Sequence, residues 1–209
     1  MPPVLLVPQG AEERAIRRGA PNAIVVAMRA GARAVALADD IPPGLIIVMG
    51  LCGALRGLRT GDCAIFRDVV DETGRYTFDE ELVQRMHATL PAAKLVNGCT
   101  IDHVVTRATE RAALAAAYNA EAVDMEGTHV ARALAARGRA SLIVRVVSDD
   151  PSFDLPPIEH AFSAEGTIRP LHLALAFVRQ PQAAARFISD VRRSLSVLSG
   201  VAGVLAEGP

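Results

Sequence analysis

The sequence predicts an α/β fold in which a central β-sheet is covered by helices on both faces. Short, continuous apolar runs alternate with Ala/Arg-rich stretches of helical periodicity through most of the chain. Strands without polar residues are typical of a sheet that is buried on both sides. The chain has 209 residues, 51% of them hydrophobic, which is enough for one such core and too apolar for a disordered protein. We therefore expect residues 1–209 to form a single domain.

The predicted elements follow one another along the chain. Apolar runs predict strands at residues 4–8, 23–28, 45–49, 63–70, 95–105 and 141–147. Helical periodicity predicts helices at residues 10–19, 30–39, 78–90, 108–118 and 124–137. The C-terminal part is predicted to be helical with an interruption at Pro181, and residues 155–169 are predicted to form a long loop.

The composition argues against several classes of function. With 22 Lys+Arg and 23 Asp+Glu the formal charge is −1, so no basic surface for nucleic acid or anionic lipid is indicated. Three cysteines without a CxxC pair predict neither a disulfide framework nor a metal site. The N-terminus lacks a signal-peptide pattern, and no apolar run approaches the roughly 20 residues that span a bilayer. We expect a cytoplasmic protein without stable membrane insertion.

Three of the predicted strand ends carry residues suited to chemistry, and ligands of doubly wound sheets bind beyond such ends. The segment Gly50–Ala54 follows an apolar strand, and glycines there let backbone N–H groups approach an anion or a sugar hydroxyl closely. The segment Val123–Glu126 leads into a predicted helix, where a carboxylate is also favoured by the helix dipole. Ser148-Asp149-Asp150 follows the last predicted strand, so an acid there is either an N-cap or a general acid with a raised pKa.

The order and spacing of these segments resemble the nucleoside phosphorylase and nucleosidase superfamily, which includes purine nucleoside phosphorylase, uridine phosphorylase and methylthioadenosine/S-adenosylhomocysteine nucleosidase. The resemblance covers residues 4–150 and is carried by Val48–Leu55 with Gly61-Asp62, by Val123–Glu126, and by Arg145–Asp149. It implies a three-layer αβα domain with a mixed sheet and a homo-oligomer. It also implies no cofactor, with inorganic phosphate as a co-substrate if the enzyme is a phosphorylase.

The resemblance further implies a role for each matching residue in cleaving a purine N-glycosidic bond. Asp149 would protonate N7 of the base, with Ser148 orienting it. Met125 would lie under the ribose, and Glu126 would bind the ribose hydroxyls. The glycine-rich turn on the phosphate or water side of the family's site is matched by Gly50, Cys52 and Gly53. We interpret Cys52 as a small wall residue, because no His partner for a nucleophile is evident.

The residues after the first predicted strand are candidates for holding the nucleophile, and the sequence leaves open whether that nucleophile is phosphate or water. A phosphorylase needs cations for phosphate, for which Arg14 and Arg29 are candidates, whereas a nucleosidase needs a carboxylate to activate water. The same segment contains Gly10, and either Glu12 or Glu13 resembles the water-activating carboxylate of the nucleosidases.

We expect phosphorolysis of an adenine-type nucleoside, with hydrolysis of the methylthioadenosine/S-adenosylhomocysteine type as the alternative. The C-terminal part is similar to the hopanoid-associated phosphorylases, which are implicated in removing adenine from adenosyl-hopane. The short connection at residues 19–22 leaves room for such a bulky 5′ substituent. A non-catalytic nucleoside-binding member is a further alternative, because Ala54 stands where relatives have a second glycine and the first loop departs from their pattern.

Overall fold

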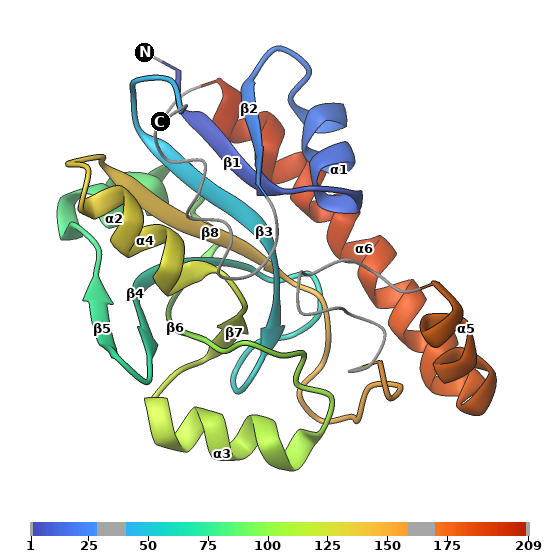
Figure 1. The fold of residues 1–209 in the computed structure, drawn as a ribbon. Helices are drawn as coiled ribbons and strands as arrows, with labels where there is room; N and C mark the ends of the chain where they lie inside the picture. Colours follow the sequence, from blue (N-terminus) through green and yellow to red (C-terminus); the bar gives the residue numbers. More distant parts are fainter. Residues whose placement is uncertain (1, 29–40, 159–169, 208–209) are drawn as a thin grey trace.

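The computed structural model describes residues 2–28, 41–158 and 170–207, and an eight-stranded mixed sheet forms the centre of this part of the chain (Figure 1). Its strands are β1 (Val4–Pro8), β2 (Ile24–Met28), β3 (Ile46–Ala54), β4 (Cys63–Asp71), β5 (Gly74–Thr77), β6 (Lys94–Thr100), β7 (Ala122–Asp124) and β8 (Ser141–Val147). Its helices are α1 (Ala11–Gly19), α2 (Glu80–Thr89), α3 (Ala108–Tyr118), α4 (Gly127–Ala135), α5 (Pro170–Arg179) and α6 (Pro181–Ala206). The helix predicted at 30–39 and much of the predicted 155–169 loop lie outside the described residues.

The order of the strands brings three chain segments to one place. The sheet runs β2-β1-β3-β7-β6-β4-β5, and β8 pairs with both β3 and β4, so that β3, β8, β4, β6 and β7 form a closed ring of pairings. In this ring Cys52 lies opposite Val147, and Gly53 lies opposite Val123. The residues that follow β7 and β8 therefore meet at the end of β3.

The predicted fold class is confirmed, and the reason lies in the burial of the strands. Every residue of β1 and of β8 is buried, as expected for continuous apolar runs between layers of helices. Helix α6 packs on β3, β4 and β8 and lies alongside α1, whereas α4 packs on β4, β6 and β8 (Figure 1). No helix in the described ranges is long and apolar enough to cross a membrane.

Four predicted boundaries are wrong, and each error comes from a short or glycine-containing strand. β3 continues to Ala54 through Gly50 and Gly53, so the predicted glycine-rich turn belongs to the strand. The helix predicted from residue 78 begins at Glu80, after a hairpin with β5 that went unpredicted. The strand predicted at 95–105 ends at Thr100. The helix predicted at 124–137 begins only at Gly127, after β7 has ended at Asp124, and it ends at Ala135. Pro181 begins α6, where the fixed φ of proline suits the first helical turn.

Close packing of α1 on α6 predicts opposite effects for two glycine substitutions. A Cβ on Gly19 would lie 1.8 Å from the backbone oxygen of Ser199, whereas a Cβ on Gly200 would meet nothing within 4 Å. We expect Gly19→Ala to lower the free energy of unfolding by about 1–3 kcal/mol through overpacking. Gly200→Ala should raise it by about 0.5–1 kcal/mol, because alanine loses less backbone entropy in a helix. Urea denaturation measures both changes, and equal effects would contradict this packing.

Candidate active site

Ser148 and Asp149 follow β8 and pack against the end of β3. The Ser148 N–H donates to the carbonyl oxygen of Cys52 over 2.9 Å. The Ser148 hydroxyl lies 2.6 Å from Asp149 Oδ1 and 3.1 Å from the Cys52 carbonyl oxygen, so its single hydrogen can be given to either. Asp149 is only 4% exposed, and its carboxylate oxygens are 3.6 and 3.7 Å from the point that a Cβ on Gly53 would occupy.

Asp149 forms a buried ion pair with an arginine from α3. Arg111 Nη1 is 2.7 Å from Asp149 Oδ2, and the two side chains are 1% and 6% exposed. Arg111 also donates to the carbonyl oxygens of Asp150 (2.9 Å) and Val105 (3.1 Å), which hold the guanidinium in place. Burial raises the pKa of Asp149 above its usual range, and the charge of Arg111 opposes that rise without cancelling it. Asp149 is therefore an acid that holds its proton to higher pH than an exposed carboxylate does.

A second buried ion pair lies where β7 and β8 end. The fully buried Arg145 of β8 donates from Nε (3.1 Å) and Nη2 (2.7 Å) to Asp124 Oδ2, and its Nη2 is 3.6 Å from Glu126 Oε2. Asp124 also accepts from the Thr100 hydroxyl (2.7 Å) and from the Gly127 N–H (3.0 Å). Two carboxylates thus share one guanidinium, and Asp124 is the one that binds it directly.

Glu12 of α1 reaches the same place from the other side of Gly50. Its Oε1 accepts from the Leu51 N–H over 2.6 Å. A Cβ on Gly50 would lie 2.4 Å from Arg145 Nη1 and 2.8 Å from Glu12 Oε1, so only glycine leaves room for both groups. Arg145 Nη1 is buried and has no hydrogen-bond partner within the described part of the chain. Burial, followed by the nearby Glu126 carboxylate, raises the pKa of Glu12 to about 7, against the lowering effects of the Leu51 N–H and Arg145.

The other predicted residues of the first loop are spread around this point. Glu13 faces away, because it pairs with Arg17 one helical turn along α1 over 2.9 Å. Gly10 precedes α1 with a φ of 110°, a backbone conformation that favours glycine. Arg14 is exposed on α1, and Arg29 lies outside the described residues. Glu12, rather than Glu13, is therefore the glutamate that the structure brings to the site.

The remaining predicted residues lie at the ends of β3, β7 and β8. Met125 is partly exposed, and Glu126 is the residue that precedes α4 rather than part of its first turn, with no capping bond from its side chain. Asp149 is not an N-cap, because it follows β8 without a helix after it. Cys52 is buried, and burial raises the pKa of its thiol well above the usual range, which keeps the thiol protonated.

Sequence reasoning missed the partners of these acids. Arg145 was part of a recognised segment, and a single charge within the apolar run of β8 was a usable signal for a buried ion pair. Asp124 likewise belongs to a segment that carries the resemblance, but the resemblance gives it no role. Arg111 gave no such signal, because an arginine in an Ala-rich helix reads as a solvent-facing residue. Among the described residues no group of His, Cys, Asp and Glu is arranged to hold a metal ion.

Comparisons with known proteins agree with this fold. The 5′-methylthioadenosine nucleosidase of Arabidopsis thaliana is 15% identical, with a TM-score of 0.66 over 99% of this chain and 93% of that one. A 5′-methylthioadenosine/S-adenosylhomocysteine nucleosidase from Streptococcus pneumoniae, bound to a transition-state inhibitor, is 21% identical, with a TM-score of 0.65 over 97% and 99%. A futalosine hydrolase mutant of Helicobacter pylori is 14% identical, with a TM-score of 0.62 over 71% and 90%.

No curated protein sequence matches the chain. The family model described as "Phosphorylase superfamily" matches residues 3–179, which is most of the chain. The structural neighbours include nucleosidases and a futalosine hydrolase, and the members of this superfamily are enzymes that act on small-molecule nucleosides. The chain therefore belongs to the phosphorylase superfamily.

Proposed function

We propose that this protein cleaves the N-glycosidic bond of an adenine-type nucleoside by hydrolysis, with Asp149 as the general acid and Glu12 as the base that activates water. The observation that carries the proposal is the meeting of Glu12, Arg145 and Glu126 over Gly50, where the pKa of Glu12 is about 7. A general base works best when its pKa lies near the working pH. The similarity to solved nucleosidases, which are hydrolytic enzymes, supports the same choice.

Asp149 and Ser148 supply the acid half of this reaction. A purine leaves more easily when N7 is protonated, because electrons of the breaking bond flow into the ring. When Asp149 is ionised, the Ser148 hydroxyl can donate to Oδ1; when Asp149 is protonated, that hydroxyl can turn to the Cys52 carbonyl oxygen instead. Ser148 thus orients the ionised carboxylate, and its turn to the Cys52 carbonyl oxygen releases Oδ1 when Asp149 carries the proton for N7.

Glu126 and Met125 supply the ribose half. The bond breaks through an oxocarbenium-like state, in which the sugar ring gains positive charge. A Glu126 carboxylate on the ribose hydroxyls orients the ring and stabilises that charge, with Met125 beneath the sugar. Arg145 and Asp124 hold this wall of the site, since Arg145 contacts both carboxylates.

Phosphorolysis, which the sequence favours, stays a prediction. It requires phosphate to bind where hydrolysis requires only a water molecule. Among the described residues, Arg145 Nη1 is a buried cationic group without a hydrogen-bond partner, and a phosphate bound to it would lie close to the Glu12 and Glu126 carboxyl groups. Phosphate there would be repelled by the Glu126 carboxylate and by the ionised form of Glu12, whereas a neutral water molecule meets no such repulsion. This contrast is why we place hydrolysis first.

The experiment that tests the proposed function is base release with and without phosphate. The substrates are adenosine, methylthioadenosine and an adenosyl-hopane mimic, and released adenine is measured by chromatography. Phosphate-independent release supports hydrolysis, and release that requires phosphate supports the phosphorylase alternative. Absence of release by folded protein would favour a non-catalytic nucleoside-binding role. The preferred 5′ group tests the proposed link to adenosyl-hopane, and sedimentation of the same sample tests the proposed homo-oligomer.

Glu12→Gln should separate the two candidate glutamates. We expect it to lower phosphate-independent release by about 10²–10⁴-fold, the usual contribution of a general base, while Glu13→Gln stays near wild type.

For the wild type, kcat/KM should rise as the pH passes through about 7, where Glu12 loses its proton. Because the folded pKa of Glu12 exceeds its ordinary value of 4.5, its contribution to stability is complete below pH 4.5 and is lost as the pH rises through 7. Glu12→Gln should therefore raise Tm at pH 8. Turnover of Glu12→Gln equal to that of the wild type would exclude Glu12 as the base.

A further inference from the structure

A hollow between α1 and α6, which lie side by side in Figure 1, contains none of the groups used in the reaction steps above. Its volume is about 270 Å³. This is just below the roughly 300–1,000 Å³ of pockets for drug-sized ligands, so the hollow has room for a small molecule. It is lined by one residue of α1 and four of α6, namely Arg18, Arg192, Leu195, Ser196 and Ser199.

The polar residues of this hollow carry hydrogen-bond donors and positive charge. Arg18 and Arg192 supply two guanidinium groups from different helices, and the two serines supply hydroxyl groups. No carboxylate is among the lining residues, and within the described ranges neither arginine has an ion pair. The next residue of α1 differs, because Arg17 Nε is 2.9 Å from the carboxylate of Glu13. The positive charge of the hollow is thus not neutralised by the described part of the chain.

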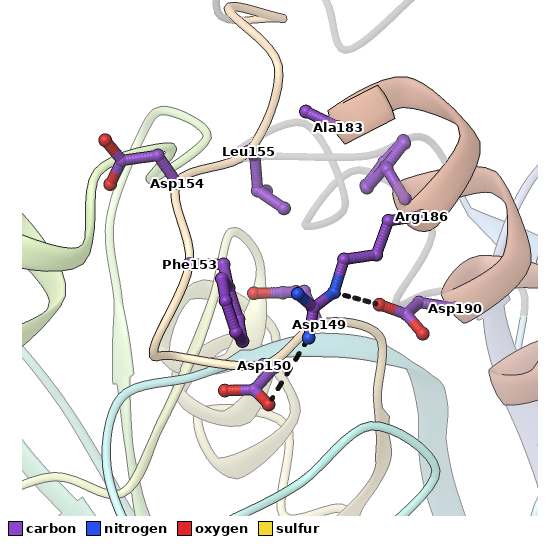
Figure 2. Close-up of a pocket in the computed structure, with 9 residues that line it drawn as sticks. Asp149, Asp150, Phe153, Asp154, Leu155, Ala183, Arg186 and Asp190 are labelled. Carbon is purple, nitrogen blue, oxygen red and sulfur yellow. Dashed lines mark ion pairs between the residues drawn. The ribbon is translucent and has the colours of Figure 1, made fainter. Parts of the chain in front are cut away.

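The arginine beside Asp149 is a contrasting case. Figure 2 shows Arg186 between Asp150 and Asp190, and its nitrogens are 3.9 Å from a carboxylate oxygen of each. The hollow at that place has a volume of about 20 Å³, which is room for one water molecule. Arg186 therefore has its counter-charges within the chain and no space beside it for an anion. The hollow between α1 and α6 has both the space and the cations.

We propose that this hollow binds a phosphate group, either inorganic phosphate or the phosphate of a small phosphorylated molecule. Guanidinium groups bind phosphate oxygens through paired N–H bonds, and serine hydroxyls can donate to the same anion. A phosphate group has three terminal oxygens, so it can accept from two guanidinium groups that approach from different helices. A carboxylate has only two oxygens and satisfies fewer of these donors. The formal charge of the whole chain is −1, so the site depends on this local arrangement and not on a basic surface.

Binding at this place does not depend on the proposed function. Glu12 belongs to the first turn of α1 and Arg18 to its last turn, and Asp149 does not line the hollow. A phosphate held by Arg18 and Arg192 would join α1 to α6. Because a ligand that binds only the folded state stabilises it, inorganic phosphate should raise Tm in a saturable manner and more than chloride does at the same ionic strength.

Removing both cations tests the site directly. Arg18→Gln combined with Arg192→Gln should fold, because both positions are exposed and glutamine is a good helix former. Calorimetry at an ionic strength of about 0.1 M, where distant charges are screened, measures binding of inorganic phosphate and of ribose 5-phosphate. For the wild type we expect a Kd of about 1 mM or tighter for at least one of the two probes. The double variant should bind that probe at least about ten-fold more weakly, the low end for hydrogen bonds to a charged group.

A matched control removes the same charge from the neighbouring positions. Arg17→Gln combined with Arg193→Gln leaves the lining of the hollow intact, because neither residue belongs to it. Arg17 pairs with Glu13, and Arg193 Nε is 3.3 Å from the point that a Cβ on Gly61 would occupy. Phosphate affinity of this control should stay within about two-fold of the wild type, since exposed charges away from the ligand are screened.

The outcomes separate the two sources of the phosphate group and can overturn the site. Tighter binding of ribose 5-phosphate supports a phosphorylated molecule as the ligand, and equal or tighter binding of inorganic phosphate supports the free ion. Equal losses in both double variants would be a general charge effect and would overturn the site. Affinity unchanged by Arg18→Gln with Arg192→Gln would place the phosphate elsewhere, such as beside Arg145, and would also overturn it. So would the absence of saturable binding of either probe up to about 10 mM. Base release enters none of these outcomes, so failure of the proposed function leaves this inference standing.

Discussion

Asp149→Asn is expected to reduce base release about 10²–10⁴-fold, the usual size of a general-acid contribution. The amide has the shape of the carboxyl group but cannot give a proton to N7 of the purine. The rate of the chemical step is measured by mixing excess enzyme with nucleoside and quenching within one turnover. Nucleoside binding, measured by calorimetry, should persist. Turnover within about three-fold of the wild type would exclude Asp149 as the acid, because such a change is small beside the expected loss.

A stability measurement and a control variant show whether Asp149→Asn loses activity because the acid is missing. Asp149→Asn leaves the buried Arg111 without its counter-charge, so the variant should also be less stable than the wild type. Rates are therefore compared well below the Tm of the variant. Asp68→Asn is a matched control, because Asp68 is an ion-paired carboxylate at the β4–β5 edge of the sheet, and burial raises its pKa as well. It should leave base release unchanged.

Arg145→Met is expected to lower the free energy of unfolding by about 3–5 kcal/mol, which is the usual effect of breaking a buried ion pair from one side. Arg145 is fully buried and provides the positive charge beside Asp124 and Glu126. Its loss leaves two carboxylates close together, away from water. Urea denaturation at pH 7 measures the change, and Arg192→Met, at an exposed position, should change stability by less than about 0.5 kcal/mol.

A second substitution tests whether the loss comes from the unpaired charge. Adding Asp124→Leu to Arg145→Met removes the carboxylate that binds the guanidinium directly, so at least about 1 kcal/mol should return. Recovery is partial, because the Thr100 hydroxyl and the Gly127 N–H lose their acceptor. If the two losses simply add, the pair is not coupled and the account of this network is wrong.

The elements that the sequence predicted well are those whose signal is local. β1 is a continuous apolar run and β8 is an apolar run interrupted by Arg145, and such runs are typical of strands buried on both faces. β5 and β7 have four and three residues, too few for a period to show, and they are strands because distant partners pair with them. Position 50 of β3 is a glycine because Arg145 and Glu12 occupy the space that a side chain would need. That constraint comes from residues far away in the chain.

The same division applies to the candidate site. By itself the sequence predicted the fold class and the segments that we propose carry the chemistry, because Glu126 and Asp149 lie two residues beyond the ends of β7 and β8, which meet at the same place. The tertiary structure decided between Glu12 and Glu13 and supplied Arg111 as the partner of Asp149. It also decided which carboxyl groups hold a proton near neutral pH, since burial raises the pKa of Glu12 to about 7. Burial depends on every atom packed around a group, and those atoms come from strands and helices that only the complete fold brings together.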